Sequence, residues 1–388
     1  MDLKRIQESL RRENLDGWLF FDHHVRDALA YRVLGVTPAG HVSRRWYYYI
    51  PADGEPRGLV HRIESKMLDA VPGEKILYSS WREQWNGLAK LLLGAKRVAM
   101  QYSPRCAVPY VAMVDAGTVE LIREFGVIVE TSAELIQEFE ASLTEEQFQS
   151  HLDAGRIVDG VCAGAFRFIA EGLSSGVDEN TVRDWVRSEF NRNGLYTDSG
   201  PIVAVNAHAG DPHYDPAPAT NAPIKPGDFV LLDMWAKLDK PGAVYYDITW
   251  TGYCGDPPER VRRVFEIVRD ARDKAVEAVV SAVAAGREIR GFEVDDAARE
   301  HIRAAGYGDR FVHRTGHSIG EEVHGSGANM DNLETHDERR IVPGALFSVE
   351  PGIYLEDFGV RSEVNVYVGT GKAGTTGEVQ RELVRIVA

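Results

Sequence analysis

Four acidic residues stand out because each lies inside or at the end of an apolar run that is typical of a β-strand. Asp233 lies in FVLLDMW and Asp247 in VYYDITW, while Glu350 ends FSVE and Glu363 lies in GVRSEVNV. An unpaired carboxylate is costly to bury in such surroundings. Any one of the four could face solvent on an amphipathic strand, but all four in two similar strand pairs predict a shared cation site.

A histidine-rich segment lies between the two strand pairs. It reads HRTGHSIGEEVH and contains His313, His317 and His324. Histidines four residues apart could form a zinc pair on one face of a helix, but Gly316 and Gly320 favour a loop or a strand. The clustering makes His317 and His324 candidates for a ligand role, which they could fill only if the fold brings them to the carboxylates.

The elements that must position these side chains occur twice in the same order. A capping box of Thr144 and Gln147 opens a long helix, a second helix is predicted over 179–193, and a hairpin follows with its turn at KLDKPG. Asp239 in that turn is explained by turn chemistry alone. Helices over 258–285 and FEVDDAAREHIRAAG then precede the strand pair ALFSVEPGIYL and GVRSEVNVYV, which indicates a weak internal duplication.

Small residues occur along the long helix predicted to begin at Thr144. Gly155 and Gly160 lie on it and are small enough to permit close packing against a neighbouring element. The part of the chain before about residue 140 differs, because it mixes a short amphipathic helix with the strand-like runs GWLFF and WYYYI. We therefore predict an α/β (α+β) protein with two domains, residues 1–140 and residues 141–388.

Composition excludes several classes of function. The 388 residues carry 44 Lys and Arg against 59 Asp and Glu, a net charge of −15, which disfavours nucleic acid and anionic membranes as partners. The charged segment MDLKRIQESLRRENLDGWLFF predicts no export signal, and the apolar runs are shorter than the roughly 20 residues of a membrane span. Three widely spaced cysteines fit a reducing compartment. We expect a cytoplasmic protein.

The histidine segment, with LLD and PHY ahead of it and VEPGIYL and GVRSE behind it, resembles the pita-bread metallopeptidase family. That family includes aminopeptidase P, prolidase, methionine aminopeptidase and the metal-free relative creatinase. The resemblance covers the whole chain. It implies a creatinase-type N-terminal α/β domain at 1–140 and, at 141–388, a pita-bread catalytic domain with a pseudo-twofold repeat.

The resemblance also implies a dinuclear metal site. Carried over position by position, the family's five metal ligands fall on residues of the expected types, namely Asp233, Asp247, His317, Glu350 and Glu363. Four carboxylates and one imidazole form a hard, oxygen-rich ligand set, which suits Mn²⁺ and also admits Co²⁺ or Zn²⁺. Two such cations can hold a bridging hydroxide and polarise a scissile carbonyl, so that no protein nucleophile is required.

Four residues take catalytic roles by the same similarity. Glu350 would accept the proton of the attacking water and pass it toward the leaving nitrogen. His213, in DPHYDP, and His324 match the histidines that contact substrate and the tetrahedral intermediate. Arg361 matches the arginine that orients substrate or ligand, although a surface position on the strand would also explain it.

The chain departs from the family pattern in the first hairpin. Its turn is three residues longer, Val244 stands where a tyrosine is usual, and Trp250 stands where the family has arginine. The missing tyrosine hydroxyl assists proton transfer in relatives. Tyr245 and Tyr246 could supply a hydroxyl from a shifted register, but a packing role explains both more simply.

The predicted function is cleavage of Xaa-Pro bonds, whose nitrogen lacks a proton and lies in a ring of fixed φ. His213 and the N-terminal domain favour this branch, with a Mn²⁺-dependent Xaa-Pro dipeptidase (prolidase) first. Alternatives are an aminopeptidase P, a metal-binding protein that has lost catalysis, and a creatinase-like enzyme. The partners implied are a small peptide with proline at its second position and a second copy in a homodimer, whose N-terminal domain would help to shape the cleft.

Overall fold

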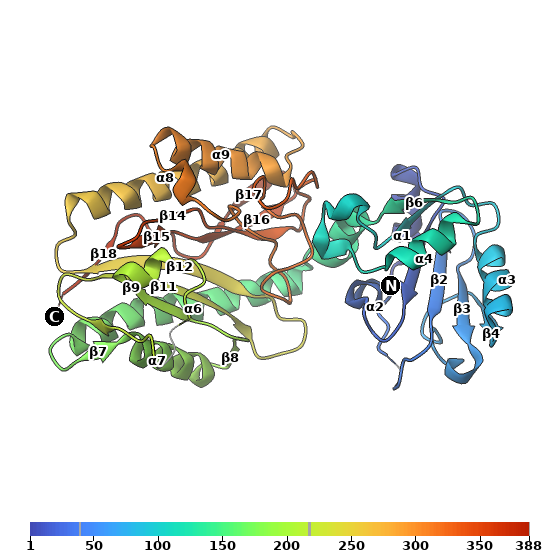
Figure 1. Ribbon diagram of the computed structural model, residues 1–388, viewed down its shortest axis with the longest axis horizontal. Helices are drawn as coiled ribbons and strands as arrows, with labels where there is room; N and C mark the ends of the chain where they lie inside the picture. The colour runs from blue at the N-terminus through green and yellow to red at the C-terminus, as the bar shows by residue number, and fades with distance from the viewer. Residues whose placement is uncertain (39, 216–218, 388) are drawn as a thin grey trace. The chain divides into compact units, whose positions relative to one another are not determined.

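The computed structural model describes residues 1–38, 40–215 and 219–387 (Figure 1). The chain divides into two compact units, Met1–Glu140 and Ala141–Ala388. All three cysteines lie in described parts of the chain and none forms a disulfide. Among the helices that the structure describes, none has both the length and the apolar composition that crossing a bilayer demands.

The first unit is built around one six-stranded sheet with the strand order β4-β3-β2-β1-β5-β6. Its strands are β1 (Gly17–Asp22), β2 (Trp46–Pro51), β3 (Arg57–His61), β4 (Glu74–Tyr78), β5 (Arg97–Met100) and β6 (Ile128–Thr131). Its helices are α1 (Leu3–Arg12), α2 (Ala28–Leu34), α3 (Trp81–Leu91), α4 (Ala116–Arg123) and α5 (Ala133–Ile136). Mixed pairing of the strands and helices packed on the sheet make this unit an α/β layer structure.

Both faces of this sheet are buried. Along β1, Trp18 and Phe20 enter one apolar cluster, while Leu19 and Phe21 enter another on the opposite face. Successive side chains of a strand point to opposite faces. A run of consecutive apolar residues such as GWLFF is therefore the pattern of a strand covered on both sides.

The second unit repeats a helix pair and a strand pair, as predicted. Its helices are α6 (Glu145–Gly172), α7 (Glu179–Arg192), α8 (Glu259–Ala284) and α9 (Gly291–Ala304). Its longer strands are β9 (Ile202–Val205), β11 (Phe229–Leu238), β12 (Tyr246–Cys254), β13 (Leu346–Val349), β16 (Val364–Gly369) and β17 (Lys372–Thr376). Shorter strands are β7 (Val177–Asp178), β8 (Leu195–Tyr196), β10 (Pro223–Ile224), β14 (Gly352–Tyr354), β15 (Gly359–Arg361) and β18 (Val384–Ile386).

The antiparallel pair β11 and β12 forms the middle layer of this unit, between α6 and α7 on one side and α8 and α9 on the other (Figure 1). Even-numbered residues of β11, such as Leu232 and Met234, pack with α6 and α7. Near its beginning, Phe229 and Leu231 pack with α8 and α9 instead. The alternation leaves Asp233 on the face that turns away from α6.

The strands of the second half are shorter than the sequence predicts. ALFSVEPGIYL forms β13 and β14 rather than one strand, because Pro351 has no N–H for a ladder. Opposite this break, Ser362 and Glu363 separate β15 from β16. Glu350 and Glu363 therefore lie at two facing interruptions, not inside strands as we expected, whereas Asp233 lies within β11.

The long helix α6 begins as predicted. Thr144 accepts from the backbone N–H of Gln147, whose side chain accepts in return from the N–H of Thr144, so the capping box is complete. A Cβ added at Gly155 would lie 2.7 Å from the ring of Tyr246, whereas one at Gly160 would meet nothing within 4 Å. Close packing thus explains Gly155 but not Gly160.

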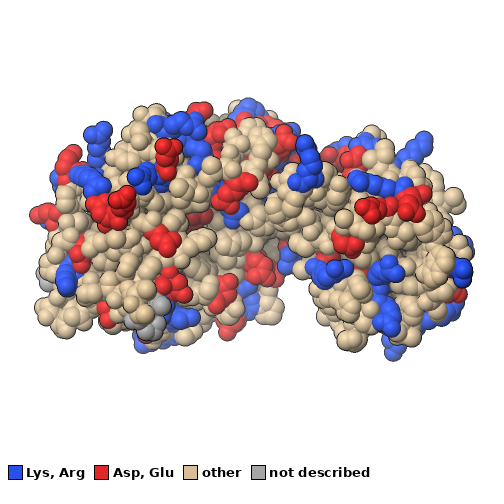
Figure 2. Space-filling model, in the orientation of Figure 1, with Lys and Arg blue, Asp and Glu red and all other residues tan. Residues whose placement is uncertain are grey.

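Charged side chains of both signs are interspersed over the face of the molecule shown in Figure 2. Acidic and basic groups lie next to one another there along the upper edge of the second unit, where Figure 1 draws α8 and α9, and also below that edge. An extended basic stripe, the usual electrostatic footprint of nucleic-acid binding, is not seen on this face.

The two helix glycines give a matched test of this packing. Gly155→Ala should lower the free energy of unfolding by about 1 to 3 kcal/mol, since Tyr246 is held by its hydrogen bond to Asp159 and cannot retreat freely. Gly160→Ala should raise it by up to about 1 kcal/mol through helix propensity. Thermal unfolding of both variants measures the difference, and an equal response of the two would contradict the close contact.

Candidate metal centre

The two aspartates lie on neighbouring strands of the middle layer. In the register of β11 and β12, Asp233 is opposite Thr249 and Trp235 is opposite Asp247. Two residues along a strand point to the same face. Both carboxylates therefore project from one face of the hairpin as diagonal neighbours, and both residues are buried, at 8% and 5% exposure.

The two glutamates approach the same place from the second half of the unit. The backbone N–H of Glu350 donates to Thr315 O at 2.7 Å, and that of Glu363 donates to Thr249 O at 3.2 Å. The side chain of Thr249 then donates to Glu363 Oε2 at 2.8 Å. These bonds connect the interrupted strands to β12 and to the histidine segment, so the two carboxylates are fixed from different parts of the chain.

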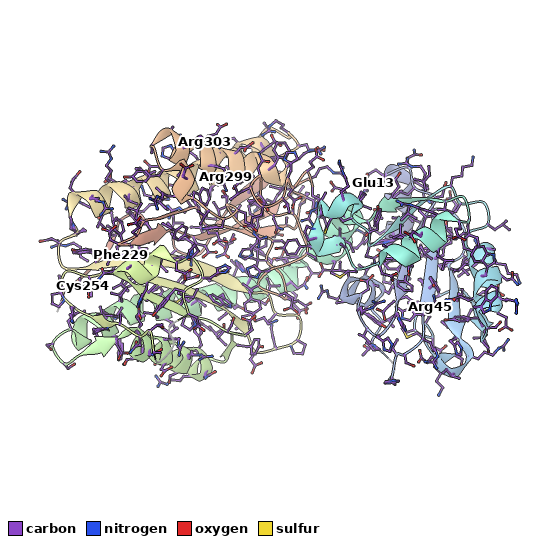
Figure 3. The ribbon with its side chains drawn as sticks, in the orientation of Figure 1. Glu13, Arg45, Phe229, Cys254, Arg299 and Arg303 are labelled. Carbon is purple, nitrogen blue, oxygen red and sulfur yellow. The ribbon has the colours of Figure 1, made fainter. Side chains whose placement is uncertain are left out.

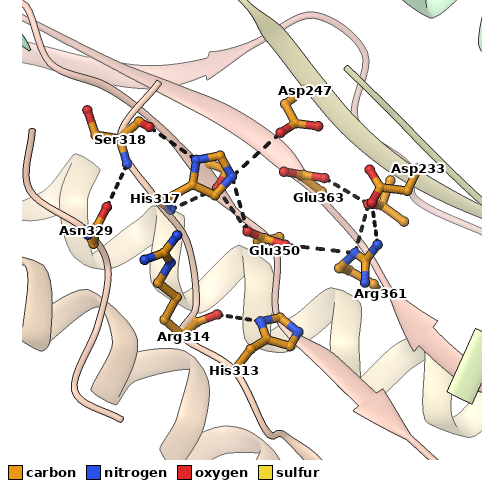
Figure 4. Close-up of polar contacts among 12 residues, drawn as sticks. Asp233, Asp247, His313, Arg314, His317, Ser318, Asn329, Glu350, Arg361 and Glu363 are labelled. Carbon is orange, nitrogen blue, oxygen red and sulfur yellow. Dashed lines mark hydrogen bonds and ion pairs between the residues drawn. The ribbon is translucent and has the colours of Figure 1, made fainter. Parts of the chain in front are cut away.

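His317 lies in a non-helical segment, as the glycines of the sequence predicted. Its backbone N–H donates to Ser348 Oγ, and its Nδ1 lies 3.2 Å from Ser318 O. Nε2 is then directed at the carboxylates, 3.6 Å from Asp247 Oδ2 and 3.5 Å from Glu350 Oε1 (Figure 4). A ring held through Nδ1 presents Nε2 as the free ligand atom.

The donor set fits a divalent cation. One ligand atom each from Asp247, His317 and Glu363 lie within 4.8 Å of one another, and all three residues are buried. Asp247 Oδ1 and Glu363 Oε1 are buried oxygens without a hydrogen-bond donor among the described residues. Buried polar atoms normally have partners, so two unsatisfied carboxylate oxygens beside an imidazole have the chemistry of metal ligands.

The electrostatics of these residues also fit a site for a divalent cation. Burial raises the pKa of the Asp247 carboxyl well above its usual range, and the charges of Asp233 and Glu350 add to the effect. Burial likewise raises the pKa of Glu363 well above its usual value, again with help from neighbouring carboxylates. Burial also lowers the pKa of His317, which keeps the imidazole neutral and able to bind metal near pH 7. Without a cation, these groups repel one another.

Arg361 is buried at the centre of this network, which excludes a surface position. Its Nη2 donates to Asp233 Oδ2 at 2.5 Å, its Nε donates to Thr249 Oγ1 at 3.1 Å, and Nε lies 3.9 Å from Glu350 Oε2 (Figure 4). Tyr354 OH accepts a bond from Nη1 at 3.0 Å. Arg361 thus orients two of the candidate ligands and supplies one permanent positive charge.

Residues that the sequence analysis did not select hold the histidine segment in place. Arg299 on α9 (Figure 3) forms a buried ion pair with Asp295 and donates to the carbonyls of Phe311 and His313. Asp295 in turn accepts from the N–H and the hydroxyl of Thr315. The i, i+4 spacing of Asp295 and Arg299 on a helix was the only available signal, and surface pairs share it.

The two predicted substrate histidines lie at the outer side of the cluster. The ring of His324 packs edge-on against that of His317, with centroids 4.4 Å apart. His213 is exposed, and its backbone N–H donates to Asp211. Burial is the main cause that lowers the pKa of His324, and the nearby His213 contributes to it. Both histidines are thus grouped with the ligand candidates, on the solvent side.

The hairpin residues that depart from the family pattern do not enter the cluster. Val244 is fully buried, and Trp250 packs among the apolar residues of α6 and α7. The Tyr246 hydroxyl donates to Asp159 on α6, as a packing role requires. Tyr245 points to the other side, where its ring packs with Ile319. The usual tyrosine hydroxyl therefore has no direct replacement at Val244.

Comparison with known proteins supports this architecture. Residues 149–370, more than half of the chain, match the model of metallopeptidase family M24. An Xaa-Pro dipeptidase of Pyrococcus furiosus is 30% identical over 252 residues, which cover 64% of this chain and 67% of that protein.

Two solved structures extend the likeness to the whole chain. The dipeptidase PepE of Mycobacterium ulcerans has a TM-score of 0.73 at 23% identity, with 100% of this chain and 97% of that chain covered. The prolidase of Thermococcus sibiricus has a TM-score of 0.65 at 26% identity, with 99% and 98% covered. The predicted pita-bread α/β fold is confirmed, and the chain belongs to metallopeptidase family M24.

Proposed function

We propose that this protein is a metal-dependent Xaa-Pro dipeptidase. The observation that carries the proposal is the convergence of Asp247, His317 and Glu363, with two unsatisfied carboxylate oxygens, in a chain of the M24 family. The similarity to an Xaa-Pro dipeptidase of Pyrococcus furiosus and to the prolidase of Thermococcus sibiricus supports a dipeptide as the substrate class. The substrate would be a small peptide with proline at its second position.

We assign the ligands of two divalent cations to five residues on the strands and the histidine segment. They are Asp233, Asp247, His317, Glu350 and Glu363. Carboxylate oxygens outnumber nitrogen in this set and no thiolate takes part, which favours Mn²⁺, with Co²⁺ and Zn²⁺ as alternatives. When bound, the cations supply Lewis-acid polarisation of the scissile carbonyl and make water acidic enough to attack near neutral pH.

Glu350 is the residue that we assign to proton transfer. Its side chain is 16% exposed, against 12% for Asp233 and 7% for Asp247, so water can reach it. Ser348 Oγ donates to its Oε1 at 3.3 Å, which steadies the carboxylate beside the imidazole of His317. A carboxylate placed in this way can accept a proton from water and return it to the leaving proline nitrogen.

His213, His324 and Arg361 would bind the substrate or orient the ligands rather than transfer a proton. His324, packed on His317, can direct an N–H at the oxygen that gains negative charge during attack. His213 lies on the solvent side, where the rest of a short peptide would extend. Arg361 keeps Asp233 and Glu350 in place through its fork of N–H groups.

The remaining assignments concern the protein as a whole. We assign residues 1–140 to a creatinase-like N-terminal domain and residues 141–388 to the catalytic domain, in agreement with the two compact units and with the family match inside the second. A homodimer in the cytoplasm is proposed on the family resemblance and on the free cysteines. Sedimentation analysis tests the dimer.

Restoring metal should restore a specific activity. Protein stripped by a chelator should be inactive, and added Mn²⁺ should give it the ability to release proline from Ala-Pro. The tripeptide Ala-Pro-Ala should be a much poorer substrate. Comparable kcat/KM values for both peptides would instead identify an aminopeptidase, and failure to cleave any Xaa-Pro peptide would reject both assignments.

Removing the imidazole beside His317 should slow the chemical step. His324→Ala should lower kcat by about 10² to 10³, the usual effect of losing a donor to a developing oxyanion. His336→Ala, at an exposed histidine beyond the histidine segment, serves as the matched control and should leave kcat unchanged. A rise in KM with kcat unchanged would show that His324 contributes only to binding of the substrate in its ground state.

Charge repulsion in the metal-free site predicts a pH-dependent stability. The folded pKa of Glu363 lies above its unfolded value of about 4.3, so the free-energy cost of its burial is small at pH 5 and grows as the pH rises. Metal-free Glu363→Gln should therefore unfold at a higher temperature than the metal-free wild type at pH 8, by about 2 to 4 °C per kcal/mol relieved.

At pH 5 the metal-free proteins should unfold at similar temperatures. Added Mn²⁺ should raise the unfolding temperature of the wild type at pH 8, and much less that of the variant. Thermal denaturation measures all four states. A metal-free wild type more stable than Glu363→Gln at pH 8 would mean that the site tolerates its negative charge without a cation.

A further inference from the structure

A fifth carboxylate lies beside the candidate metal centre and is neither a proposed metal ligand nor a proposed catalytic residue. Asp198 follows β8, and its Oδ1 accepts a hydrogen bond of 2.8 Å from Trp235 Nε1. Trp235 is the cross-strand partner of Asp247 and lies on the same face of β11 as Asp233. The indole thus connects Asp198 to the face of the hairpin that carries the ligand aspartates.

Packing of the neighbouring chain holds Asp198 and Trp235 in place. A Cβ added at Gly200 would lie 2.9 Å from the Trp235 ring, so the chain just after Asp198 packs directly on the indole. Ser199 Oγ also donates to Asp198 Oδ1, at 3.1 Å. Both donors use the same oxygen. Among the described residues, Asp198 Oδ2 accepts no hydrogen bond, and the side chain is exposed.

The charge of Asp198 has no counter-ion in the described parts of the chain. In these parts of the chain, no Lys, Arg or His nitrogen lies within 4.0 Å of its carboxylate oxygens, which accept only from Trp235 and Ser199. Lys237, on the same face of β11, lies 4.8 Å from the centre of the Tyr245 ring and donates to Glu321 O. Through its bond to Trp235, the carboxylate lies beside the cross-strand partner of Asp247.

Charge balance decides what such a group could bind. Two divalent cations would neutralise the four carboxylates assigned as ligands, and Arg361 adds a further positive charge. Asp198 then remains as a separate negative charge next to the hairpin face that carries Asp233 and Asp247. A free dipeptide carries an ammonium group one residue before the scissile bond, since α-amino groups titrate at about 7.7 to 8.0. A carboxylate with one free oxygen is a suitable acceptor for it.

We propose that Asp198 binds a cationic group on the N-terminal residue of the substrate. The α-ammonium is one source of that charge, and a lysine or arginine side chain at the same residue is the other. The inference rests on the proposed function, because it assigns a specificity-determining residue to the same site. Trp235 would act as a positioning residue that holds the carboxylate by Oδ1 and leaves Oδ2 for the substrate.

The test compares ligands that differ only in the ammonium. N-Acetylproline is Gly-Pro without its amino group, so KM for Gly-Pro and the inhibition constant of N-acetylproline report the same site with and without the charge. Asp198→Asn should raise KM for Gly-Pro by about tenfold with kcat nearly unchanged, and should leave the inhibition constant of N-acetylproline unaltered. Elemental analysis should find the same metal content in both proteins.

The control is Asp239→Asn, which removes an exposed carboxylate from the turn of the same hairpin and should change nothing. A tenfold effect on Lys-Pro but none on Gly-Pro would identify the side chain as the cation. Equal weakening of Gly-Pro and N-acetylproline, no weakening of any peptide, or loss of metal from Asp198→Asn would overturn the proposal.

Failure of the proposed function is distinguishable from failure of this inference. If the metal-loaded wild type cleaves no Xaa-Pro peptide, the proposed function is rejected. Calorimetry then measures the dissociation constants of Gly-Pro and N-acetylproline directly, without heat from hydrolysis. Preference for Gly-Pro that Asp198→Asn abolishes would still support the role of Asp198, whereas absence of any preference would reject it.

Discussion

Mutual repulsion among buried carboxylates is the constraint on which this structure depends. Asp233, Asp247, Glu350 and Glu363 gather near the neutral imidazole of His317, and the buried Arg361 supplies a permanent positive charge among them. Burial of like charges without counter-ions is too costly to persist unless it serves a function. The second unit bears this cost where strands from both of its halves converge.

The fold makes this convergence possible through two structural devices. Alternation along β11 and β12 puts Asp233 and Asp247 on one face and the apolar packing of α6 on the other. In the second half, facing interruptions at Glu350 and Glu363 free two carboxylates from regular strand geometry while backbone hydrogen bonds to Thr315 and Thr249 still hold them. One half therefore contributes ligands from intact strands and the other from broken ones.

The sequence predicted the repeated helix and strand order, the capping box at Thr144 and the acidic residues, because each has a local signal. It placed Glu350 and Glu363 inside strands, since apolar periodicity does not register how Pro351 divides a ladder. Arg361 was open to a surface reading because exposure depends on which elements cover a strand. The importance of the Asp295–Arg299 pair has no local signal in the sequence. It comes from the carbonyls of residues 311 and 313, which the fold brings to Arg299.

The central claim is that five side chains hold two cations close together. Electron paramagnetic resonance of protein loaded with Mn²⁺ tests it most directly, combined with elemental analysis. The account predicts two ions per chain and the spectrum of a spin-coupled pair, as expected for ions about 3.5 to 4 Å apart. A spectrum of isolated Mn²⁺, or fewer than one ion per chain at saturation, would contradict it.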